Sequence, residues 1–286
     1  MIEAVQTGTD KVRVSVVVPC FNEELGVGGV IEGLRKAMTG AGLKDGEDFE
    51  IVVVDDGSED ASAAAAEKAG ARVIRHPCNR GYGRSLLTGF AAARFPWVLM
   101  IDGDGSYPPE AAAELLPFAP GFDMIVGARR GVHFWGSPLQ AFLRWIYLFL
   151  ASFAAGEDIP DANSGLRLIR KEAFDNSMPI LCYGYSLSTT MTLSFLNGGR
   201  FVKFISIDYL VRTGSSKVRK FRDIPRTLQI MMQVMIYFNP LKFAVFLAAL
   251  IGLVSALIFG PLGLAAALPV FFWGCVLDSI RLNRAS

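Results

Sequence analysis

The sequence is poor in the residues that bind zinc and other soft metals. It contains only two histidines and four cysteines, and the cysteines form no Cys-x-x-Cys pair; they are Cys20, Cys78, Cys182 and Cys275. This spacing argues against a cysteine–histidine zinc site. Reduced thiols in a domain that faces the cytosol are the expected state.

An excess of charge of either sign is also missing. The 28 basic and 27 acidic side chains leave a formal net charge of +1, which argues against a nucleic-acid partner. Hydrophobic residues make up 52% of the chain and charged residues 19%, a balance that excludes disorder as the dominant state. The first 13 residues lack an apolar core, so no secretory signal peptide is expected. A mean hydropathy of +0.38 nevertheless requires an apolar segment elsewhere.

That segment lies near the C-terminus, where no residue from Phe243 to Leu277 is charged. Gly260-Pro261 divides it into two halves of about 17 to 19 residues, the minimal length that spans a bilayer. The pattern predicts a two-helix transmembrane hairpin over 241–286, with a short basic tail. The alternative is a pair of buried core helices, but so long an uncharged run exceeds what a soluble core helix pair usually shows.

The charges that flank the apolar segment predict its orientation. Basic residues lie on both sides of it: Lys217, Arg219, Lys220, Arg222, Arg226 and Lys242 before it, and Arg281 and Arg284 after it. Positive flanks on both sides place both ends in the cytoplasm, with an even number of spans. A cytoplasmic domain over 1–225 and an amphipathic interfacial helix over 226–240 are therefore expected ahead of the hairpin. Two short spans per chain are also compatible with a homo-oligomer.

The first half of the chain alternates between apolar β-branched runs and helix-like stretches. The expected strands are Val14–Val18, Ile51–Val54, Arg72–Ile74, Val98–Ile101 and Met124–Val126, and the expected helices are Val27–Met38, Ala61–Ala69, Ser85–Arg94 and Glu110–Leu116. Continuous apolar strands separated by helices predict a Rossmann-like α/β domain with a mostly parallel sheet covered on both faces. Ligands bind such sheets outside the carboxyl ends of the strands.

Polar residues follow four of the expected strands at that edge. They are Pro19 to Glu24, Asp55 to Ser58, Asp102 to Gly105, and Gly127 to Arg130. Each group alone is explained by turn or capping chemistry. Together they indicate a binding site with carboxylates from three strands and arginines from a fourth. The glycine-rich stretch Asn79–Arg84 is expected mainly to form a tight strand-to-helix turn.

Asp102 and Asp104 are candidate metal ligands. Two aspartates one residue apart, with no histidine or cysteine nearby, favour a hard cation such as Mg²⁺ or Mn²⁺. Mg²⁺ commonly joins one or two carboxylates to a diphosphate. The pair therefore indicates a metal-bound phosphate ligand.

The motifs VVPCFNEE, VVDDGSED, NRGYGRSLLTG and MIDGDGSYPPE, in this order, resemble those of the family-two glycosyltransferases of GT-A fold. The segments VGARR, DANSGLRLIRKEAF and GSSKVR, followed by a membrane hairpin, look like the polyprenyl-phosphate glycosyltransferases. That group includes the dolichyl-phosphate mannose synthases and their bacterial undecaprenyl-phosphate relatives. The resemblance covers residues 12 to 225 by motif and the rest of the chain by architecture.

The resemblance implies roles on the donor side. Pro19, Asn22 and Glu23 would line the nucleoside pocket, while Asp55 would hold the base and Asp56 the ribose region. Asp102 would lie near the ribose or diphosphate, and Asp104 would be the principal metal ligand. The mannose synthases often carry a glutamine two residues after that aspartate, but here the position is Ser106, which leaves the third metal ligand open.

On the acceptor side, the resemblance implies that Arg129 meets phosphate. Residues of the family's acceptor segment and of its basic closing segment follow: Asp161, Ser164, Gly165, Arg167, Arg212, Ser216 and Lys217. The apolar stretch Leu139–Ala154 is expected to lie at the membrane surface, with Arg144 near the lipid phosphate. Gln140 to Trp145 is one residue too long for the QxxRW motif of processive polysaccharide synthases.

A lipid phosphate is already ionised at neutral pH, so its glycosylation needs positioning and charge neutralisation rather than a general base. The expected activity is transfer of a hexose, of mannose or glucose type, from a nucleotide-diphosphate sugar to polyprenyl phosphate at the cytoplasmic membrane face. The transfer would invert the sugar and depend on a metal, with Asp104, Arg129 and Lys217 as catalytic residues. Two alternatives stay open: another acceptor, such as diacylglycerol or a nascent polysaccharide, and a non-catalytic scaffold, which the retained aspartates disfavour.

Overall fold

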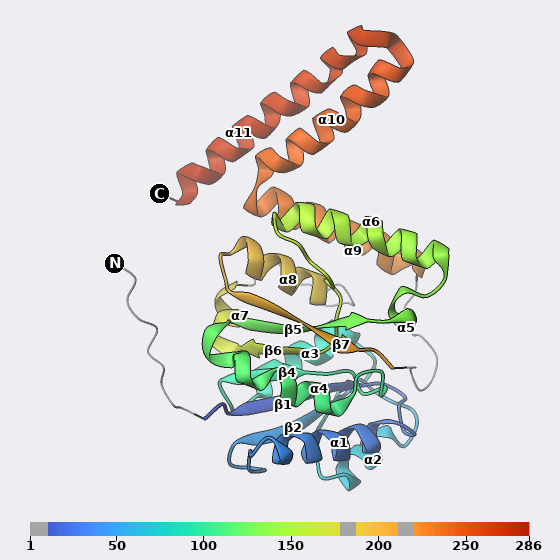
Figure 1. Cartoon of the computed structure of the whole chain (residues 1–286), viewed down its shortest axis with the longest axis vertical. Coiled ribbons are helices and arrows are strands. Elements are labelled where there is room, and N and C mark those ends of the chain that lie inside the picture. Colours follow the sequence, from blue (N-terminus) through green and yellow to red (C-terminus); the bar gives the residue numbers. More distant parts are fainter. Residues whose placement is uncertain (1–10, 178–186, 211–219, 286) are drawn as a thin grey trace.

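A computed structural model of the chain describes residues 11–177, 187–210 and 220–285. Within these residues seven strands form one mixed sheet in the order β3-β2-β1-β4-β6-β5-β7 (Figure 1). The strands are β1 (Val14–Cys20), β2 (Phe49–Asp55), β3 (Arg72–Arg75), β4 (Trp97–Met100), β5 (Met124–Arg130), β6 (Arg167–Arg170) and β7 (Val202–Asp208). The five strands expected from the sequence are present, and the α/β prediction with a mostly parallel sheet is confirmed.

Helices cover both faces of the sheet because its central strands are apolar on both sides. Val14, Val16 and Val18 of β1 pack into one core, and Val17 packs into the other. The first core is covered by α1 (Val27–Gly40), α2 (Ser62–Lys68), α4 (Pro109–Glu114) and the 3-10 helix η1 (Leu116–Gly121). The second is covered by α3 (Tyr82–Ala92), α7 (Lys171–Ser177) and α8 (Leu187–Asn197).

Strand β6 is antiparallel to both of its neighbours, a feature that the sequence patterns did not predict. Its first residue, Arg167, pairs with Met100 of β4 and with Val126 of β5. The start of β6 therefore lies beside the last residue of β4, and β5 continues past it to Arg130. Residues 161–166, which precede β6, reach the ligand edge for this reason.

A third layer lies over α8 and consists of α6 (Pro138–Ala155), preceded by the short α5 (Val132–Trp135), and α9 (Lys220–Phe238). The buried faces of α6, α8 and α9 form a separate apolar cluster. A capping box at Ser137 and Gln140 starts α6, and Gly156, with a φ of +82°, ends it. Helix α9 begins at Lys220, ahead of the start expected at residue 226.

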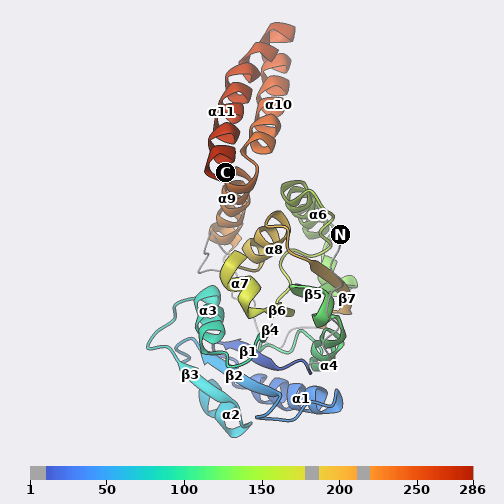
Figure 2. The same cartoon turned by 90° about the vertical axis from the view of Figure 1, so that its left-hand side faces the viewer.

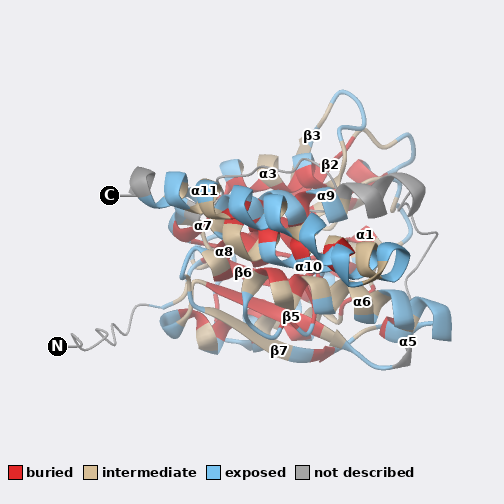
Figure 3. Cartoon of the chain, turned by 90° about the horizontal axis from the view of Figure 1, so that it is seen from above, coloured by how far each residue is buried: buried red, intermediate tan, exposed pale blue. Residues whose placement is uncertain are grey.

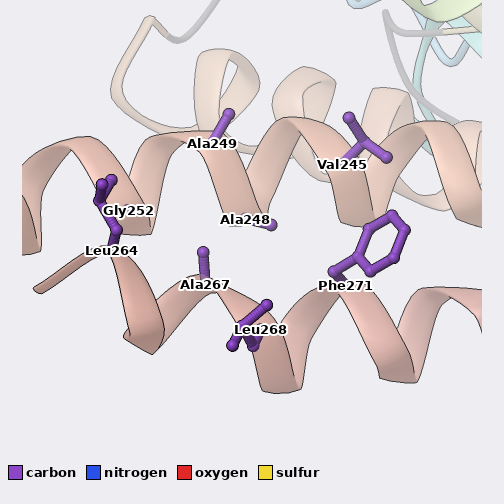
Figure 4. Close-up of a pocket in the computed structure, with 8 residues that line it drawn as sticks. All are labelled: Val245, Ala248, Ala249, Gly252, Leu264, Ala267, Leu268 and Phe271. Atoms are coloured by element: carbon purple, nitrogen blue, oxygen red, sulfur yellow. The ribbon is translucent and has the colours of Figure 1, made fainter. Parts of the chain in front are cut away.

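The apolar C-terminal segment folds back on itself as α10 (Pro240–Phe259), the 3-10 segment η2 (Gly260–Ala267) and α11 (Leu268–Ala285). The break falls at Gly260-Pro261, as expected, and the two helices run side by side away from the sheet domain (Figure 2). Small residues allow their close approach, because a Cβ on Gly274 would overlap Ala244. An apolar groove between the helices is lined by eight residues (Figure 4): Val245, Ala248, Ala249, Gly252, Leu264, Ala267, Leu268 and Phe271.

Two helical segments of the described chain are long and apolar enough to cross a membrane, Pro138–Ala155 and Pro240–Leu282. The second contains the hairpin, whose surface is largely exposed (Figure 3). The 20 residues of α10 correspond to about 30 Å of helix, the thickness of a bilayer core. In contrast, α6 runs along the domain beside α9 (Figure 1), and its own residues Ala151 and Ala154 are buried.

Polar groups gather where the hairpin joins the domain. Arg281 of α11 forms an ion pair with Asp278 at 3.1 Å and donates to the carbonyl of Phe238, the last residue of α9. The end of a helix leaves carbonyls without intrahelical partners, and this arginine satisfies one of them. The contact ties the second hairpin helix to the end of α9.

Removal of residues 239–286 should leave a folded domain, because the buried residues of all three cores precede Asn239. We expect the truncated chain to keep a cooperative thermal unfolding transition. It should leave the membrane fraction in part only, since the exposed apolar faces of α6 and α9 remain. Carbonate extraction of membranes measures this, with the full chain as the control. A truncated chain that resists extraction would contradict the assignment of the hairpin as the spanning segment.

Candidate active site

The loops after β1 and β2 are joined to each other by hydrogen bonds. The backbone N–H of Asn22 donates to Ser58 Oγ at 2.9 Å, and its side-chain oxygen accepts from the N–H of Glu59 at 3.0 Å. Glu23 N–H donates to Ser62 Oγ at 2.7 Å. Asn22 has a φ of +51°, a left-handed conformation that asparagine tolerates. These contacts hold the expected nucleoside-binding residues Asn22 and Glu23 together with the β2 loop.

The residues beside this pair differ in exposure. Pro19 is half-buried at the end of β1, whereas Asp55 is 4% exposed and accepts the N–H of Ser58 at 3.1 Å. Cys20 between them is buried, and burial raises the pKa of its thiol to about 12. The thiol is therefore protonated and unreactive at neutral pH.

The Asp56 carboxylate forms hydrogen bonds with other groups of the protein. It is 3% exposed and lies 2.7 Å from His76 Nδ1. It also accepts the N–H groups of Arg80 at 2.9 Å and of Gly81 at 2.8 Å. Asp56 thus fixes the glycine-rich turn that leads into α3, and its expected role at the ribose stays a prediction.

Asp102 and Asp104 lie together in the loop after β4. Asp102 Oδ1 accepts the hydroxyl of Tyr82 at 2.8 Å, and Asp104 Oδ1 accepts both the N–H and the hydroxyl of Ser106, at 2.9 and 2.6 Å. Ser106 therefore supports Asp104 from within the loop. Among the described residues no three His, Cys, Asp or Glu side chains form a ready-made metal cluster. Two carboxylates completed by diphosphate oxygens and water are nevertheless a ligand set that suits Mg²⁺.

Arg129 and Asp161 form a bidentate ion pair at the end of β5. Arg129 Nε lies 2.7 Å and Nη2 lies 2.9 Å from the two carboxylate oxygens. The Asp161 side chain is 2% exposed and that of Arg129 is 16% exposed. Burial alone would raise the pKa of Asp161, but the charge of Arg129 and its hydrogen bonds lower it on balance. Both groups are therefore ionised at neutral pH.

Aromatic rings surround these charges. Arg129 lies over the rings of Phe134 and Tyr209, with its guanidinium carbon 5.1 and 5.3 Å from their centroids. Arg144 of α6 lies over the Phe134 ring at 4.1 Å. Its Nη1 is shielded from solvent and has no hydrogen-bond partner in the described part of the chain. Two guanidinium groups thus share one ring beside a single buried carboxylate.

The segment that leads into β6 connects the two sets of residues. Gly165 N–H donates to the hydroxyl of Tyr107 at 2.7 Å, and Ser164 Oγ donates to the carbonyl of Gly127. A Cβ on Gly165 would lie 2.7 Å from the carboxyl carbon of Asp102. This glycine therefore allows the acceptor-side segment to touch the loop that carries the aspartate pair.

Arg167 is oriented inward. It is fully buried and donates to the carbonyls of Ser164 and Ala162 and to Thr192 Oγ1, at 2.9, 2.8 and 2.8 Å. Burial lowers its pKa to about 10. The arginine holds the turn before β6 in place, and contact with an acceptor phosphate stays a prediction for this residue. Arg212, Ser216 and Lys217 lie outside the described residues.

Several site residues were not found by the analysis of the sequence. Tyr82, Phe134 and Tyr209 contact predicted charged residues, and Tyr107 contacts the predicted acceptor-side residue Gly165. Tyr82 had a signal, because it follows Gly81 in the glycine-rich turn. Tyr209 had none, because strand β7, which it follows, was itself not predicted.

The parallel strands that end in carboxylates, with a crossing antiparallel strand, define an α/β fold of the GT-A type. Residues 15–177 match the family described as glycosyl transferase family 2. The chain therefore belongs to this family of glycosyltransferases.

Curated relatives extend beyond one group of organisms. An uncharacterized protein of Methanocaldococcus jannaschii is 34% identical over 172 residues, 57% of this chain and 67% of that one. An undecaprenyl-phosphate 4-deoxy-4-formamido-L-arabinose transferase of Pseudomonas aeruginosa is 40% identical over 123 residues, 41% of this chain and 35% of that one. A low-salt glycan biosynthesis hexosyltransferase of Haloferax volcanii is 31% identical over 225 residues, 76% of this chain and 52% of that one. The chain thus spans between about a third and two thirds of these relatives.

Solved structures share the fold. Glucosyl-3-phosphoglycerate synthase of Mycobacterium tuberculosis, in complex with phosphoglyceric acid, superposes with a TM-score of 0.62 at 21% identity over 82% of each chain. The same enzyme with Mn²⁺, UDP and glucosyl-3-phosphoglycerate gives a TM-score of 0.61 at 22% identity, again over 82% of each chain. At this level of sequence identity, the structural similarity shows a shared fold and no more.

Neighbouring arginine–aspartate pairs allow a matched test of the buried ion pair. Asp161→Asn should destabilise the chain by about 3 to 5 kcal/mol, because it leaves Arg129 buried without its counter-charge. Asp208→Asn breaks the Arg130–Asp208 pair, whose side chains are 62% and 72% exposed, and should cost no more than about 1 kcal/mol. Denaturant unfolding of both variants measures the difference.

The same pair has a defined pH dependence. Because the folded-state pKa of Asp161 is lowered, its contribution to stability is present above the ordinary carboxyl pKa of about 3.9 and is lost as the pH falls through the folded value. The stability gap between wild type and Asp161→Asn should therefore persist at pH 7 and shrink below about pH 4. A gap that is constant down to acid unfolding would contradict an ionised Asp161.

Proposed function

We propose that this glycosyltransferase transfers a hexose from a nucleotide-diphosphate sugar to polyprenyl phosphate at the cytoplasmic face of a membrane. The observation that carries the proposal is the pair of guanidinium groups, Arg129 and Arg144, on the Phe134 ring. One buried carboxylate, Asp161, accompanies them. The excess positive charge suits a phosphate, and Arg144 comes from the apolar helix α6, beside which a lipid would lie.

The donor belongs at the other end of the site. The β1 and β2 loops, with Pro19, Asn22, Glu23 and Asp55, would hold the nucleoside, and Asp102 and Asp104 would face the diphosphate. Asp104 and Asp102 would hold Mg²⁺ or Mn²⁺. The metal would neutralise charge on the nucleoside diphosphate as it leaves. Structural neighbours solved with UDP and Mn²⁺ or Mg²⁺ support this assignment.

The acceptor phosphate needs cations rather than a base. Its oxygen already carries negative charge, so the chain has to bring it to the sugar carbon against the charge of the donor. Arg129 is held rigid by Asp161 and presents a fixed guanidinium plane, while Arg144 approaches from α6. Arg212, Ser216 and Lys217 would complete the cradle from the segment before α9. Attack on the face opposite the leaving group would invert the sugar.

The membrane would lie against α6, α9 and the hairpin. Helix α6 exposes Leu139, Phe142, Leu143, Trp145 and Phe149, each more than half exposed. The ring of Trp145 stacks near those of Phe142 and Phe149, at 6.3 and 6.0 Å. Aromatic rings on an exposed helix face are typical of interfacial helices. With the hairpin spanning, both termini and the sheet domain would be cytoplasmic.

A different acceptor is the second candidate. The P. aeruginosa relative is named for an undecaprenyl-phosphate acceptor, but the chain covers only 35% of it. A diacylglycerol or nascent polysaccharide would present a hydroxyl, and transfer of the sugar to that hydroxyl would require a general base. Arg144 Nη1, which has no hydrogen-bond partner among the described residues, favours an anion over an alcohol.

The metal assignment predicts loss of activity on removal of a ligand. Asp104→Ala should abolish transfer, and EDTA should abolish transfer by the wild-type chain until Mg²⁺ or Mn²⁺ is added. Glu67→Gln, at the exposed Arg75–Glu67 pair, is the control and should keep full activity. Transfer of radiolabelled sugar in membrane extracts measures the effect of the substitution and of EDTA. The donor is found first by a screen of nucleotide sugars. Full turnover in excess chelator would exclude the metal.

Arg144→Ala separates phosphate from alcohol acceptors. It should remove a charge-assisted contact of about 1.5 to 3 kcal/mol, which lowers acceptor kcat/KM roughly 10- to 150-fold with donor KM nearly unchanged. Arg144→Lys should recover only part, because a point charge cannot reproduce a planar fork. Arg75→Ala, at an exposed arginine paired with Glu67, should have little effect. Efficient transfer to polyprenol, or a defect confined to donor affinity, would favour the second candidate.

A further inference from the structure

The Asp102 carboxylate is confined on two sides by groups from distant parts of the chain. The hydroxyl of Tyr82, at the start of α3, donates to Oδ1 at 2.8 Å. The backbone of Gly165 lies against the same carboxylate so closely that a Cβ would come within 2.7 Å of its carboxyl carbon. Asp102 therefore has one side-chain orientation rather than several.

The Gly165 contact is itself fixed. Gly165 N–H donates to the hydroxyl of Tyr107 at 2.7 Å, and Tyr107 is 1% exposed. The Tyr107 ring meets the Tyr209 ring edge to face, with centroids 5.5 Å apart. The glycine thus cannot withdraw from Asp102 without disturbing the buried Tyr107 and its contact with Tyr209.

The position of Tyr82 is equally constrained. Gly81, which caps α3, has a φ of +96°, and its N–H and that of Arg80 are bound by the Asp56 carboxylate. His76 connects Asp56 to the same helix, because its Nε2 lies 3.0 Å from Thr88 Oγ1. The end of β2 therefore determines where the Tyr82 hydroxyl meets the loop after β4.

The Tyr82 hydroxyl donates to Asp102 Oδ1, so its proton is directed at the carboxylate. A carboxylate that accepts such a bond is held in one orientation.

We propose that Tyr82 is a positioning residue, which orients the Asp102 carboxylate toward the metal-bound diphosphate of the donor. The proposal rests on the proposed function, since it assigns a use to the aspartate pair. Hydrogen-bond partners behind a metal ligand orient it, and their loss typically weakens metal affinity about 10- to 100-fold. A merely structural hydrogen bond would affect stability alone.

Tyr82→Phe tests this, because it removes the hydroxyl and keeps the ring. We expect the full-length chain in detergent to bind Mn²⁺ about 10- to 100-fold more weakly, measured by electron paramagnetic resonance of free Mn²⁺ with and without UDP or GDP. Tyr147→Phe is the matched control. Its hydroxyl lies 2.6 Å from Thr189 Oγ1 in the α6–α8 contact, so it also loses a hydrogen bond of the protein interior. Its Mn²⁺ affinity should stay within about twofold of wild type, well short of the roughly 10- to 100-fold loss expected for Tyr82→Phe.

Wild-type Mn²⁺ affinity in a folded Tyr82→Phe chain would overturn the proposal. If that variant does not fold, Gly165→Ala decides the matter, because it displaces the same carboxylate from the other side and leaves Tyr82 intact. Gly121→Ala, where a Cβ meets nothing within 4 Å, is its control. Unchanged Mn²⁺ affinity in Gly165→Ala would then overturn the proposal. A wild-type chain that binds no Mn²⁺ would instead contradict the metal assignment in the proposed function, and the role of Tyr82 with it.

Discussion

The site depends on the antiparallel pairing of β6 with β4 and β5. This register places Arg167 opposite Met100 and Val126, so the segment before β6 lies at the end of β4 and along the last residues of β5. Gly165 then touches Asp102, and Asp161 reaches Arg129. A parallel β6 would carry the segment to the opposite edge of the sheet. One reversed strand therefore joins the proposed donor and acceptor halves of the site.

Charge compensation organises the joined halves. The Asp102 and Asp104 carboxylates form one pole, while Arg129 and Arg144 form the other, and the buried Asp161 balances only part of the positive charge. Charge–charge interactions are stronger in the protein interior than in water, because the effective dielectric constant is lower. The arginines are stabilised there by aromatic rings and by a bidentate carboxylate. This arrangement suits a reaction in which two phosphate-bearing molecules have to meet.

The layers of the molecule match its proposed work at a membrane. Helix α8 separates the sheet from α6 and α9, and its hydroxyls form hydrogen bonds to both sides: Thr192 with Arg167, and Thr189 with Tyr147 of α6. The exposed aromatic face of α6 thus belongs to an element that is hydrogen-bonded to the core behind the site. The hairpin adds length beyond this layer and contributes none of the described site residues.

The local sequence pattern was sufficient to predict the first five strands, the break at Gly260-Pro261 and the aspartates at the strand ends. Each follows from apolar periodicity or from turn chemistry within a few residues of the chain. Membership of the family followed from ordered motifs in the same way. The sequence alone thus determined the class of fold, the edge of the sheet that carries the site and the kinds of charge found there.

Tertiary structure decided which of these groups act on one another. Strands β6 and β7 are short or half-buried, so their patterns carried little signal, and only pairing with β4 and β5 defines them. Asp56, whose expected role at the ribose stays a prediction, binds His76 and the turn before Tyr82, and Arg167 is directed into the core. Partners of this kind are separated by 20 or more residues, and local propensity does not report such contacts. The sequence determined the charges and their edge, because these depend on neighbours along the chain; packing decided their contacts, because these depend on neighbours in space.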